Sequence, residues 1–235
     1  MKARGGDFVK KVATKGHTIE AYNALRNNIQ FIDDGAVRCI ALTSATSNDG
    51  KTTVTLNLAQ AFASAEQKTL LIDADMRNPS LHKALHLSNA RGLSDVLREG
   101  KDVVVIKLEN IPNLYFLSSG KRPYDPSHLL GSDAMRHFLQ AMRAHFDMVI
   151  IDTPPVLPVS DACMLSRHVD GMLVVVRYGS TYEGGAIRTQ RALALANANI
   201  VGVVLNDIPV SDSRAYGNPR RIKRTKKAKK RRQKP

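Results

Sequence analysis

Short apolar runs alternate along this chain with longer segments whose apolar residues recur every three or four positions. The runs are typical of buried strands, and the longer spacing is typical of amphipathic helices. The runs predict strands at residues 37–43, 68–73, 114–117, 148–151, 171–177 and 200–205. The spacing predicts helices at 19–32, 54–65, 127–146, 159–169 and 183–198, and shorter helical pieces at 80–85 and 93–98. Thr18 is the expected N-cap of the first helix, and residues 103–106 fit neither pattern clearly.

The alternation of strands and helices predicts an α/β fold with three layers. Strands that are apolar along their whole length are typical of a parallel sheet that is buried on both faces. We therefore expect a mostly parallel central sheet covered by helices on both faces. In such sheets the ligand lies at the carboxyl ends of the strands, which directs attention to the residues that follow each strand.

Residues 45–52 have the pattern A-x-x-x-x-G-K-T and follow the first predicted strand. This is the phosphate-binding loop of P-loop NTPases with Ala in place of the first Gly, so the expected cofactors are ATP and Mg²⁺. Gly50 lets the backbone approach an anion, Lys51 reaches the β- and γ-phosphates, and the Thr52 hydroxyl ligates magnesium. A chance match in a Ser/Thr-rich turn is the alternative. The candidate nucleotide-binding residues of the loop are Ala45, Thr46, Ser47, Asn48, Asp49, Gly50, Lys51, Thr52 and Thr53.

Three carboxylates follow predicted strands and should lie at the same edge as the loop: Asp73, Asp75 and Asp152. They would repel one another in a partly dry cleft, and magnesium would relieve that cost. Asp152, after a short apolar strand, suits the Walker B position. One of Asp73 and Asp75 can touch the metal shell while the other accepts a proton from a hydroxyl. Alternatively, one of them caps a turn or pairs with Arg77.

Composition is that of a globular protein with a basic tail. The chain has 235 residues, of which 43% are hydrophobic, enough for one domain with a sizeable core. We find no run long enough to span a bilayer and no signal-peptide core. Cys39 and Cys163 are expected to be reduced, packed thiols.

Most of the net charge of +14 belongs to the last residues of the chain. Residues 214–235 hold 12 Lys or Arg and no Asp or Glu, which leaves 23 basic and 21 acidic residues elsewhere. We predict a flexible arm at 1–18, one P-loop domain at 19–208 and a disordered basic tail at 209–235. The tail is either simply solvated or attached to anionic lipid. It lacks the interleaved aromatic residues that would support nucleic-acid recognition, so a nucleic-acid partner is disfavoured.

The three motifs together resemble those of the bacterial tyrosine kinases of capsule and exopolysaccharide assembly. These have a Walker A, a Walker A′ and a Walker B motif on a P-loop NTPase fold shared with partition-type ATPases. The matching segments are 45–52, 70–77 and 149–155, supported by 125–132, 160–162 and 202–206. The resemblance covers residues 20–206.

Carried over by position, the resemblance assigns roles to the same residues. It implies that Lys51 and Thr52 bind phosphate and Mg²⁺ and that Asp75 and Asp152 serve the Mg²⁺ site. It makes Asp73 the candidate base for a tyrosine hydroxyl. The predicted catalytic residues are therefore Lys51, Asp73, Asp75 and Asp152, and the predicted metal residues are Thr52, Asp75 and Asp152.

Two loop positions and one distant residue refine this expectation. Partition-type ATPases carry a signature lysine five residues before the P-loop lysine, where this chain has Thr46, which favours the kinase branch. The family loop usually reads P-G-E-G-K-S, whereas this chain has Asn48 in place of the first of those glycines. Asn tolerates positive φ, so the loop should still close. By resemblance, Asn206 lies near the adenine.

Assembly and acceptor features depart further from the family. The E-x-x-R-x-x-R assembly motif is reduced to Glu20, Asn23 and Arg26, which leaves homo-oligomer formation open. The C-terminal tyrosine cluster is reduced to Tyr216, the candidate phosphoacceptor.

We therefore expect an autophosphorylating, ATP-dependent protein-tyrosine kinase that regulates capsular or exopolysaccharide synthesis and chain length. The expected partner is a membrane-spanning polysaccharide co-polymerase that acts as activator. The expected location is cytoplasmic, peripheral at the inner face of the plasma membrane. The alternatives are a partition-type ATPase switch that binds membrane or DNA through its tail, and a degenerate kinase that acts as a scaffold.

Overall fold

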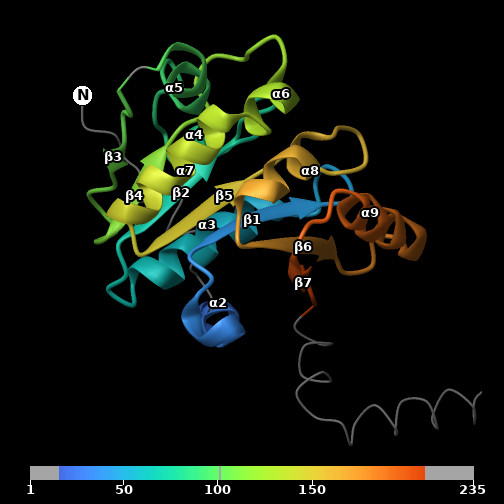
Figure 1. Cartoon of the computed structure of the whole chain (residues 1–235). Helices are drawn as coiled ribbons and strands as arrows, with labels where there is room; N and C mark the ends of the chain where they lie inside the picture. The colour runs from blue at the N-terminus through green and yellow to red at the C-terminus, as the bar shows by residue number, and fades with distance from the viewer. Residues whose placement is uncertain (1–15, 101, 210–235) are drawn as a thin grey trace, which may run out of the picture.

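The structure, a computed structural model, describes residues 16–100 and 102–209. In this part of the chain, strands form one sheet in the order β3-β4-β2-β5-β1-β6-β7 (Figure 1). The strands are β1 (Cys39–Ser44), β2 (Thr69–Asp73), β3 (Ile106–Lys107), β4 (Leu114–Leu117), β5 (Met148–Asp152), β6 (Gly171–Arg177) and β7 (Ile200–Asn206). The short edge strand β3 pairs antiparallel with β4, and the other pairs are parallel.

Helices cover the sheet on both faces, which confirms the predicted three-layer fold. The helices are α2 (Gly16–Gln30), α3 (Lys51–Ala63), α4 (Leu81–Ala84), α5 (Leu93–Glu99), α6 (Pro126–Leu130), α7 (Asp133–His145), α8 (Asp161–Leu165) and α9 (Glu183–Leu195). Two 3-10 helices, η1 (Ile32–Gly35) and η2 (Ser166–His168), complete the described elements. Helices α2, α3 and α4 contribute side chains to one core cluster, and α5 to α9 contribute to the other.

The central strands are buried on both sides because successive side chains point to opposite faces. In β1, Leu42 joins the cluster that contains Phe62 of α3, whereas Ala41 joins the cluster that contains Leu139 of α7. Every residue of β1, β2 and β5 is buried. Full burial of one Leu or Ile side chain contributes about 1.5–3 kcal/mol, so these apolar runs fix the register of the three strands that lead to the site.

One predicted helix is wrong in its continuity: residues 127–146 form α6 and α7 instead of a single helix. Pro126 occupies the first turn of α6, and the Asp125 carboxylate accepts a hydrogen bond from the amide of His128. The helical conformation is then interrupted at Ser132, whose backbone is extended. The Ser132 side chain caps α7 by accepting a hydrogen bond from the amide of Met135. Apolar spacing continues through the break, which is why periodicity alone did not reveal it.

Other boundaries differ by a few residues. Helix α2 begins at Gly16, so Thr18 lies inside it and is not its N-cap. The predicted helix at 159–169 is shorter, with α8 followed by the 3-10 turn η2. Strand β1 starts at Cys39, two residues after the predicted start, and residues 103–106 contribute only Ile106 to a strand.

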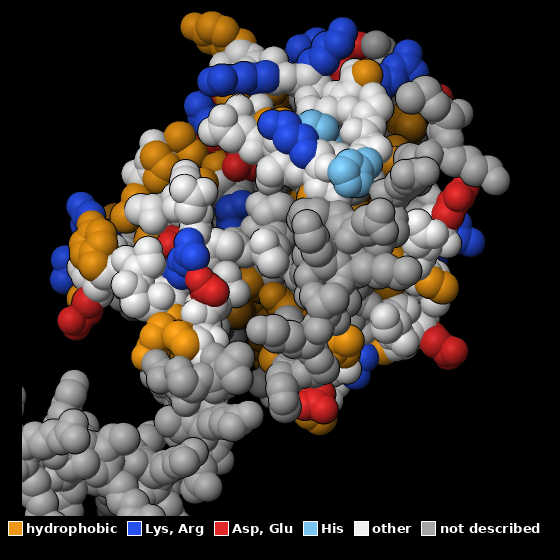
Figure 2. Space-filling model, turned by 180° about the vertical axis from the view of Figure 1, so that it is seen from behind, with side chains coloured by type: hydrophobic (Ala, Val, Ile, Leu, Met, Phe, Trp, Pro, Cys, Tyr) orange, Lys and Arg blue, Asp and Glu red, His pale blue; other side chains and the backbone are white. Residues whose placement is uncertain are grey.

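The face of the molecule seen in Figure 2 carries both basic and acidic side chains, as expected from the near-neutral charge of the chain without its tail. Neither cysteine forms a disulfide, and burial raises the pKa of the Cys39 thiol to about 12, in agreement with a packed thiol. Among the described helices, none has the length and apolar character required to cross a bilayer. The predicted N-terminal arm up to residue 15, the tail from residue 210 and Tyr216 lie outside the described residues.

Candidate active site

Three neighbouring strands end at the same level of the sheet. Asp73, the last residue of β2, lies opposite Asp152, the last residue of β5. Leu42 of β1 pairs with Asp152 from the other side, two residues before β1 ends. The topology thus brings the loop after β1 and the acids after β2 and β5 to one edge.

The loop after β1 has the conformation that its glycine and asparagine permit. Asn48 has φ of 70° and Gly50 has φ of 85°, both in the left-handed region. The positive φ of Asn48 confirms that asparagine can serve where the related loops carry Gly. The positive φ of Gly50 strains any other residue at this position, and a Cβ atom there would also lie 2.0 Å from the side-chain amide nitrogen of Asn206. Helix α3 begins at Lys51, directly after Gly50, and its N-terminus therefore faces the loop.

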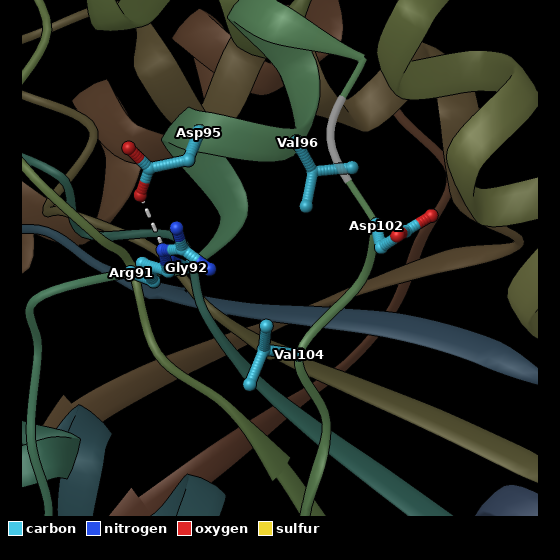
Figure 3. Close-up of a pocket in the computed structure, with 6 residues that line it drawn as sticks. All are labelled: Arg91, Gly92, Asp95, Val96, Asp102 and Val104. Atoms are coloured by element: carbon cyan, nitrogen blue, oxygen red, sulfur yellow. Dashed lines mark hydrogen bonds between the residues drawn. The ribbon is translucent and has the colours of Figure 1, made fainter.

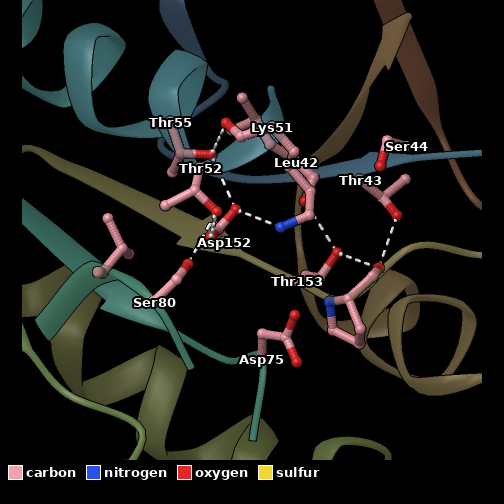
Figure 4. Close-up of polar contacts among 12 residues, drawn as sticks. Leu42, Thr43, Ser44, Lys51, Thr52, Thr55, Asp75, Ser80, Asp152 and Thr153 are labelled. Carbon is pink, nitrogen blue, oxygen red and sulfur yellow. Dashed lines mark hydrogen bonds and ion pairs between the residues drawn. The ribbon is translucent and has the colours of Figure 1, made fainter. Parts of the chain in front are cut away.

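Lys51 and Asp152 form a buried ion pair at the centre of this edge (Figure 4). The Lys51 ammonium lies 2.8 Å from Oδ1 of Asp152, and the two side chains are 8% and 0% exposed. The hydroxyl of Thr52 donates to Oδ2 at 2.7 Å, and that of Thr55 donates to Oδ1 at 3.1 Å. The Asp152 carboxylate is therefore fully partnered, and one of its partners is the lysine expected to contact phosphate.

Asp73 is a fully buried acid beside this pair. Its Oδ2 accepts from the amides of Ser80 and Leu81, both at 3.1 Å, and its Oδ1 accepts from the amide of Asp75 at 3.2 Å. Burial above all, and then the charge of Asp152, raise the pKa of Asp73 to about 8, while the amide of Leu81 opposes the rise. The group thus exchanges its proton near neutral pH.

Asp75 lies after the end of β2 in a turn, so Asp73 and Asp75 do not share a strand face. Its Oδ1 accepts from the amide of Asn78 at 2.9 Å, which is the turn-capping contact considered from the sequence. Arg77 pairs with Asp161 and not with Asp75. Burial is the main cause that raises the pKa of Asp75, and its side chain lies across the site from Lys51 and Asp152 (Figure 4).

Asp49 braces the loop from inside and is 3% exposed. Its Oδ2 accepts from the amide and the hydroxyl of Thr46, and its Oδ1 accepts from the hydroxyl of Thr181 at 2.9 Å. The Asn206 amide donates to the carbonyl of Asp49 at 3.1 Å. Asn206 is therefore placed against the backbone of the loop, and its predicted adenine contact stays a prediction.

Sequence reasoning missed two hydroxyl groups that complete the site. Thr55 lies one helical turn after Lys51, so its contact with Asp152 follows from the spacing within α3. The hydroxyl of Ser80 lies 3.1 Å from that of Thr52 across the site, and the Ser80 amide donates a hydrogen bond to Asp73. No sequence signal indicated Ser80, because its position depends on the turn that reverses the chain after β2.

No group of three or more His, Cys, Asp or Glu side chains in the described ranges is arranged to hold a metal ion. A separate hollow lies between α5 and the segment after it and contains none of these site residues (Figure 3). It is lined by Arg91, Gly92, Asp95, Val96, Asp102 and Val104.

Comparison with known proteins identifies the family. The model of an AAA domain matches residues 37–184. Tyrosine-protein kinase YwqD of Bacillus subtilis is 37% identical over 222 residues, which cover 92% of this chain and 94% of that protein. The chain belongs to the bacterial tyrosine-protein kinases. The resemblance noted from the three motifs is thereby confirmed.

A longer relative and a solved structure also match most of the chain. The tyrosine-protein kinase etk of Escherichia coli is 37% identical over 201 residues, which cover 84% of this chain and 28% of that longer protein. The crystal structure of the chimerical protein CapA2B2 has a TM-score of 0.81 and 34% identity, covering 86% of this chain and 90% of that chain.

The septum site-determining protein MinD of Pyrococcus horikoshii is more distant. It has 22% identity and a TM-score of 0.59, and the match covers 74% of each chain. That likeness shows a shared fold alone, so the comparisons do not favour the partition-type alternative over a bacterial tyrosine kinase.

Proposed function

We propose that this chain transfers the γ-phosphoryl group of ATP to a tyrosine hydroxyl at the edge where β1, β2 and β5 end. One observation carries the proposal: Lys51 and Thr52 both contact the Asp152 carboxylate, at 2.8 Å and 2.7 Å. Asp73, whose pKa is raised to about 8, lies opposite Asp152 on the neighbouring strand. Family membership supplies the reaction type, and the proposal concerns which residues carry it out.

Lys51 and the loop amides would hold the phosphates. The ammonium is engaged with Asp152, so it has to exchange a carboxylate oxygen for a phosphate oxygen when nucleotide binds. Thr52 and Thr55 continue to satisfy Asp152 after that exchange, which lowers its cost. The N-terminus of α3 adds a favourable field at the same point.

The residues present fit a magnesium ion that arrives with the nucleotide. The Thr52 hydroxyl and Asp152 Oδ2 lie side by side at 2.7 Å, and Asp75 lies across from them. Mg²⁺ usually keeps several waters and binds one or two protein groups together with phosphates, so a preformed cage of three acids is not required. When bound, the ion supplies charge neutralisation between the acids and the phosphates.

Asp73 would accept the proton of the acceptor hydroxyl. A base with a pKa of about 8 is matched to that task near neutral pH. Because Asp73 is fully buried, the hydroxyl reaches it through a bridging water or after the segment that donates the three amides has moved. As the attacking oxygen bonds to phosphorus, the bond from phosphorus to ADP breaks and the proton passes to the carboxylate.

The wider assignment follows the family. We propose that the chain regulates capsular or exopolysaccharide synthesis beside a membrane-spanning activator at the inner face of the plasma membrane. In this proposal Tyr216 is the acceptor in autophosphorylation, and the basic tail contacts anionic lipid. Arg26 of the assembly motif donates to the carbonyl of Ala61 at 3.1 Å, so a role in self-association would require this contact to be released.

Calorimetric titration with ATP, with and without Mg²⁺, tests the nucleotide site. We expect affinity to fall at least about tenfold without Mg²⁺, because uncompensated acids would then face the phosphates. Thr52→Ala should lose most of the Mg²⁺-dependent gain, whereas Ser88→Ala, a change at an exposed position outside the site, should keep it. Equal affinity with and without Mg²⁺, or identical behaviour of the two variants, would contradict the assignment.

A further inference from the structure

We propose that Arg77 and Asp161 form a positioning pair for phosphoryl transfer, which holds the acidic segment after β2 so that Asp75 faces the nucleotide site. This inference rests on the proposed function. Neither residue contacts Lys51 or Asp152, so the pair acts through the placement of the segment between them.

The pair has the geometry of a fixed two-point clamp. Arg77 Nε lies 2.9 Å from Oδ2 of Asp161, and Arg77 Nη2 lies 2.9 Å from Oδ1. The Asp161 side chain is 0% exposed and that of Arg77 is 28% exposed. A planar guanidinium that meets a carboxylate at two points fixes orientation as well as distance, which a lysine ammonium does not.

Two serines extend the clamp to a third segment of chain. The hydroxyl of Ser127 donates to Asp161 Oδ1 at 2.5 Å and accepts from Arg77 Nη2 at 3.2 Å. The hydroxyl of Ser160 lies 3.3 Å from that of Ser127. Every oxygen of the buried Asp161 carboxylate is thereby partnered, as a buried charge requires.

The clamp joins chain segments that follow three different strands. Arg77 follows β2, Ser127 is the second residue of α6 after β4, and Asp161 is the first residue of α8 after β5. The sheet order places β4, β2 and β5 side by side, so these segments lie next to one another at the carboxyl edge. The two supporting sequence stretches at 125–132 and 160–162 thus gain a physical role, since each supplies a hydrogen-bonding partner to the clamp.

The carboxylate of Asp75 has a local contact, since it accepts from the amide of Asn78, three residues later. Bonds from the amides of Asp75, Ser80 and Leu81 to Asp73, together with the buried Met76, hold the segment to β2 and the core, and the clamp adds an attachment to two helices. Arg77 lies inside that turn and attaches it to α6 and α8. A displacement of about 1 Å at a reacting site can lower a rate by about 10²-fold, so the tie affects turnover even though it touches no reacting atom.

The test compares phosphotyrosine formation, ATP affinity and thermal stability of the full chain in single and double variants. Asp161→Asn should lower kcat at least tenfold while the calorimetric Kd for ATP changes less than threefold, because the loop and Lys51 are left in place. This variant also leaves Arg77 partly unpaired and should lower Tm, so by itself it does not separate placement from stability.

The double variant Arg77→Met/Asp161→Leu separates the two. Apolar residues of similar volume in place of a buried ion pair often restore stability. We expect Tm to recover while kcat stays at least tenfold low. Recovery of kcat together with Tm would show that the pair only stabilises the fold and would overturn the inference.

Arg143→Met is the matched control. Arg143 pairs with Asp170 at 2.9 Å, with side chains 32% and 26% exposed, near the start of β1 at the opposite edge of the sheet. Its loss should lower Tm with kcat unchanged. A wild-type chain that forms no phosphotyrosine would refute the proposed function itself, whereas an active wild type with an equally active double variant would refute only the positioning role.

Discussion

Two buried aspartates follow the same apolar run of β5, and each is paired with a cation from a different part of the chain. Asp152 ends the strand and meets Lys51 through one ammonium contact at 2.8 Å. Asp161 begins α8 and meets Arg77 through two contacts at 2.9 Å. Both carboxylates are 0% exposed, yet the two cations differ in how firmly they can be held.

The difference teaches how one site combines a movable charge with a fixed one. A lysine ammonium is a point charge on a flexible stem, so Lys51 can turn from Asp152 toward a phosphate while two threonine hydroxyls keep the carboxylate satisfied. An arginine fork is rigid and bidentate, so Arg77 keeps its partner. The first pair suits ligand binding, and the second suits the placement of the segment that carries Asp75.

Among changes to the Lys51–Asp152 pair, which we call the movable pair, Lys51→Met should have the largest effect. We expect phosphoryl transfer to fall on the order of 10²–10³-fold or more, since a preorganised cation at the developing charge is lost. The matched control is Lys68→Met, because Lys68 lies over the rings of Tyr115 and Phe146 away from the loop. Rates of ATP-dependent tyrosine phosphorylation check this; a Lys51→Met chain as active as Lys68→Met would refute the role of Lys51.

A smaller effect should follow from changes at Asn48, whose positive φ sets the loop that carries Lys51. Asn48→Val should weaken ATP binding at least about tenfold, because a β-branched residue in this region costs about 1–3 kcal/mol. Asn48→Gly, which tolerates the same φ, should stay within about threefold of wild type. Calorimetric Kd values measure both, and equal losses would mean that loop conformation does not control the movable pair.

The last prediction concerns stability and not turnover: it is the pH dependence of stability that arises beside Asp152. Asp73 has a folded pKa of about 8 against an ordinary value of 3.8. The folded chain therefore holds a proton that the unfolded chain releases, so this contribution is complete below about pH 4 and is lost as pH rises through about 8. Wild type should lose stability relative to Asp73→Asn between pH 5 and pH 9.

Thermal denaturation of the ligand-free chain measures this difference. Linkage removes about 1.4 kcal/mol per pH unit between pH 5 and about 8, on the order of 4 kcal/mol in all, so the Tm of wild type should fall on the order of 10 °C relative to that of Asp73→Asn. Asp133→Asn serves as control, since the Asp133 side chain is 83% exposed. A Tm difference between the two chains that stays constant from pH 5 to pH 9 would show that Asp73 is ionised throughout this range. A wild type that gains stability relative to Asp73→Asn as pH rises would contradict the raised pKa.

The parts of the site that rest on local spacing could be predicted from the sequence. The loop from Ala45 to Thr52 reads directly as a phosphate-binding loop, and the positive φ of Asn48 follows from residue preference. Topology then sufficed to bring Asp73 and Asp152 together, because parallel strands end at one edge. These inferences needed only the period of the apolar residues and the motif spacing.

The remaining contacts depend on separations that periodicity does not encode. Arg77 and Asp161 are 84 residues apart, and neither residue type indicates the other. Asp49 bonds Thr181 across 132 residues, so its role as a brace could not be read from the loop. The break at Ser132 was missed because a polar cap can interrupt a helix without disturbing the apolar spacing on either side.

The central claim is that this edge of the sheet transfers phosphate from ATP to tyrosine. The most direct measurement incubates the purified chain with Mg²⁺-ATP, a synthetic glutamate–tyrosine copolymer and the Lys51→Met chain as a second acceptor, and identifies modified residues by mass spectrometry. We predict Mg²⁺-dependent phosphotyrosine that is absent when only Lys51→Met is present. Tight ATP binding without phosphotyrosine on the chain, the copolymer or the Lys51→Met acceptor would contradict the account.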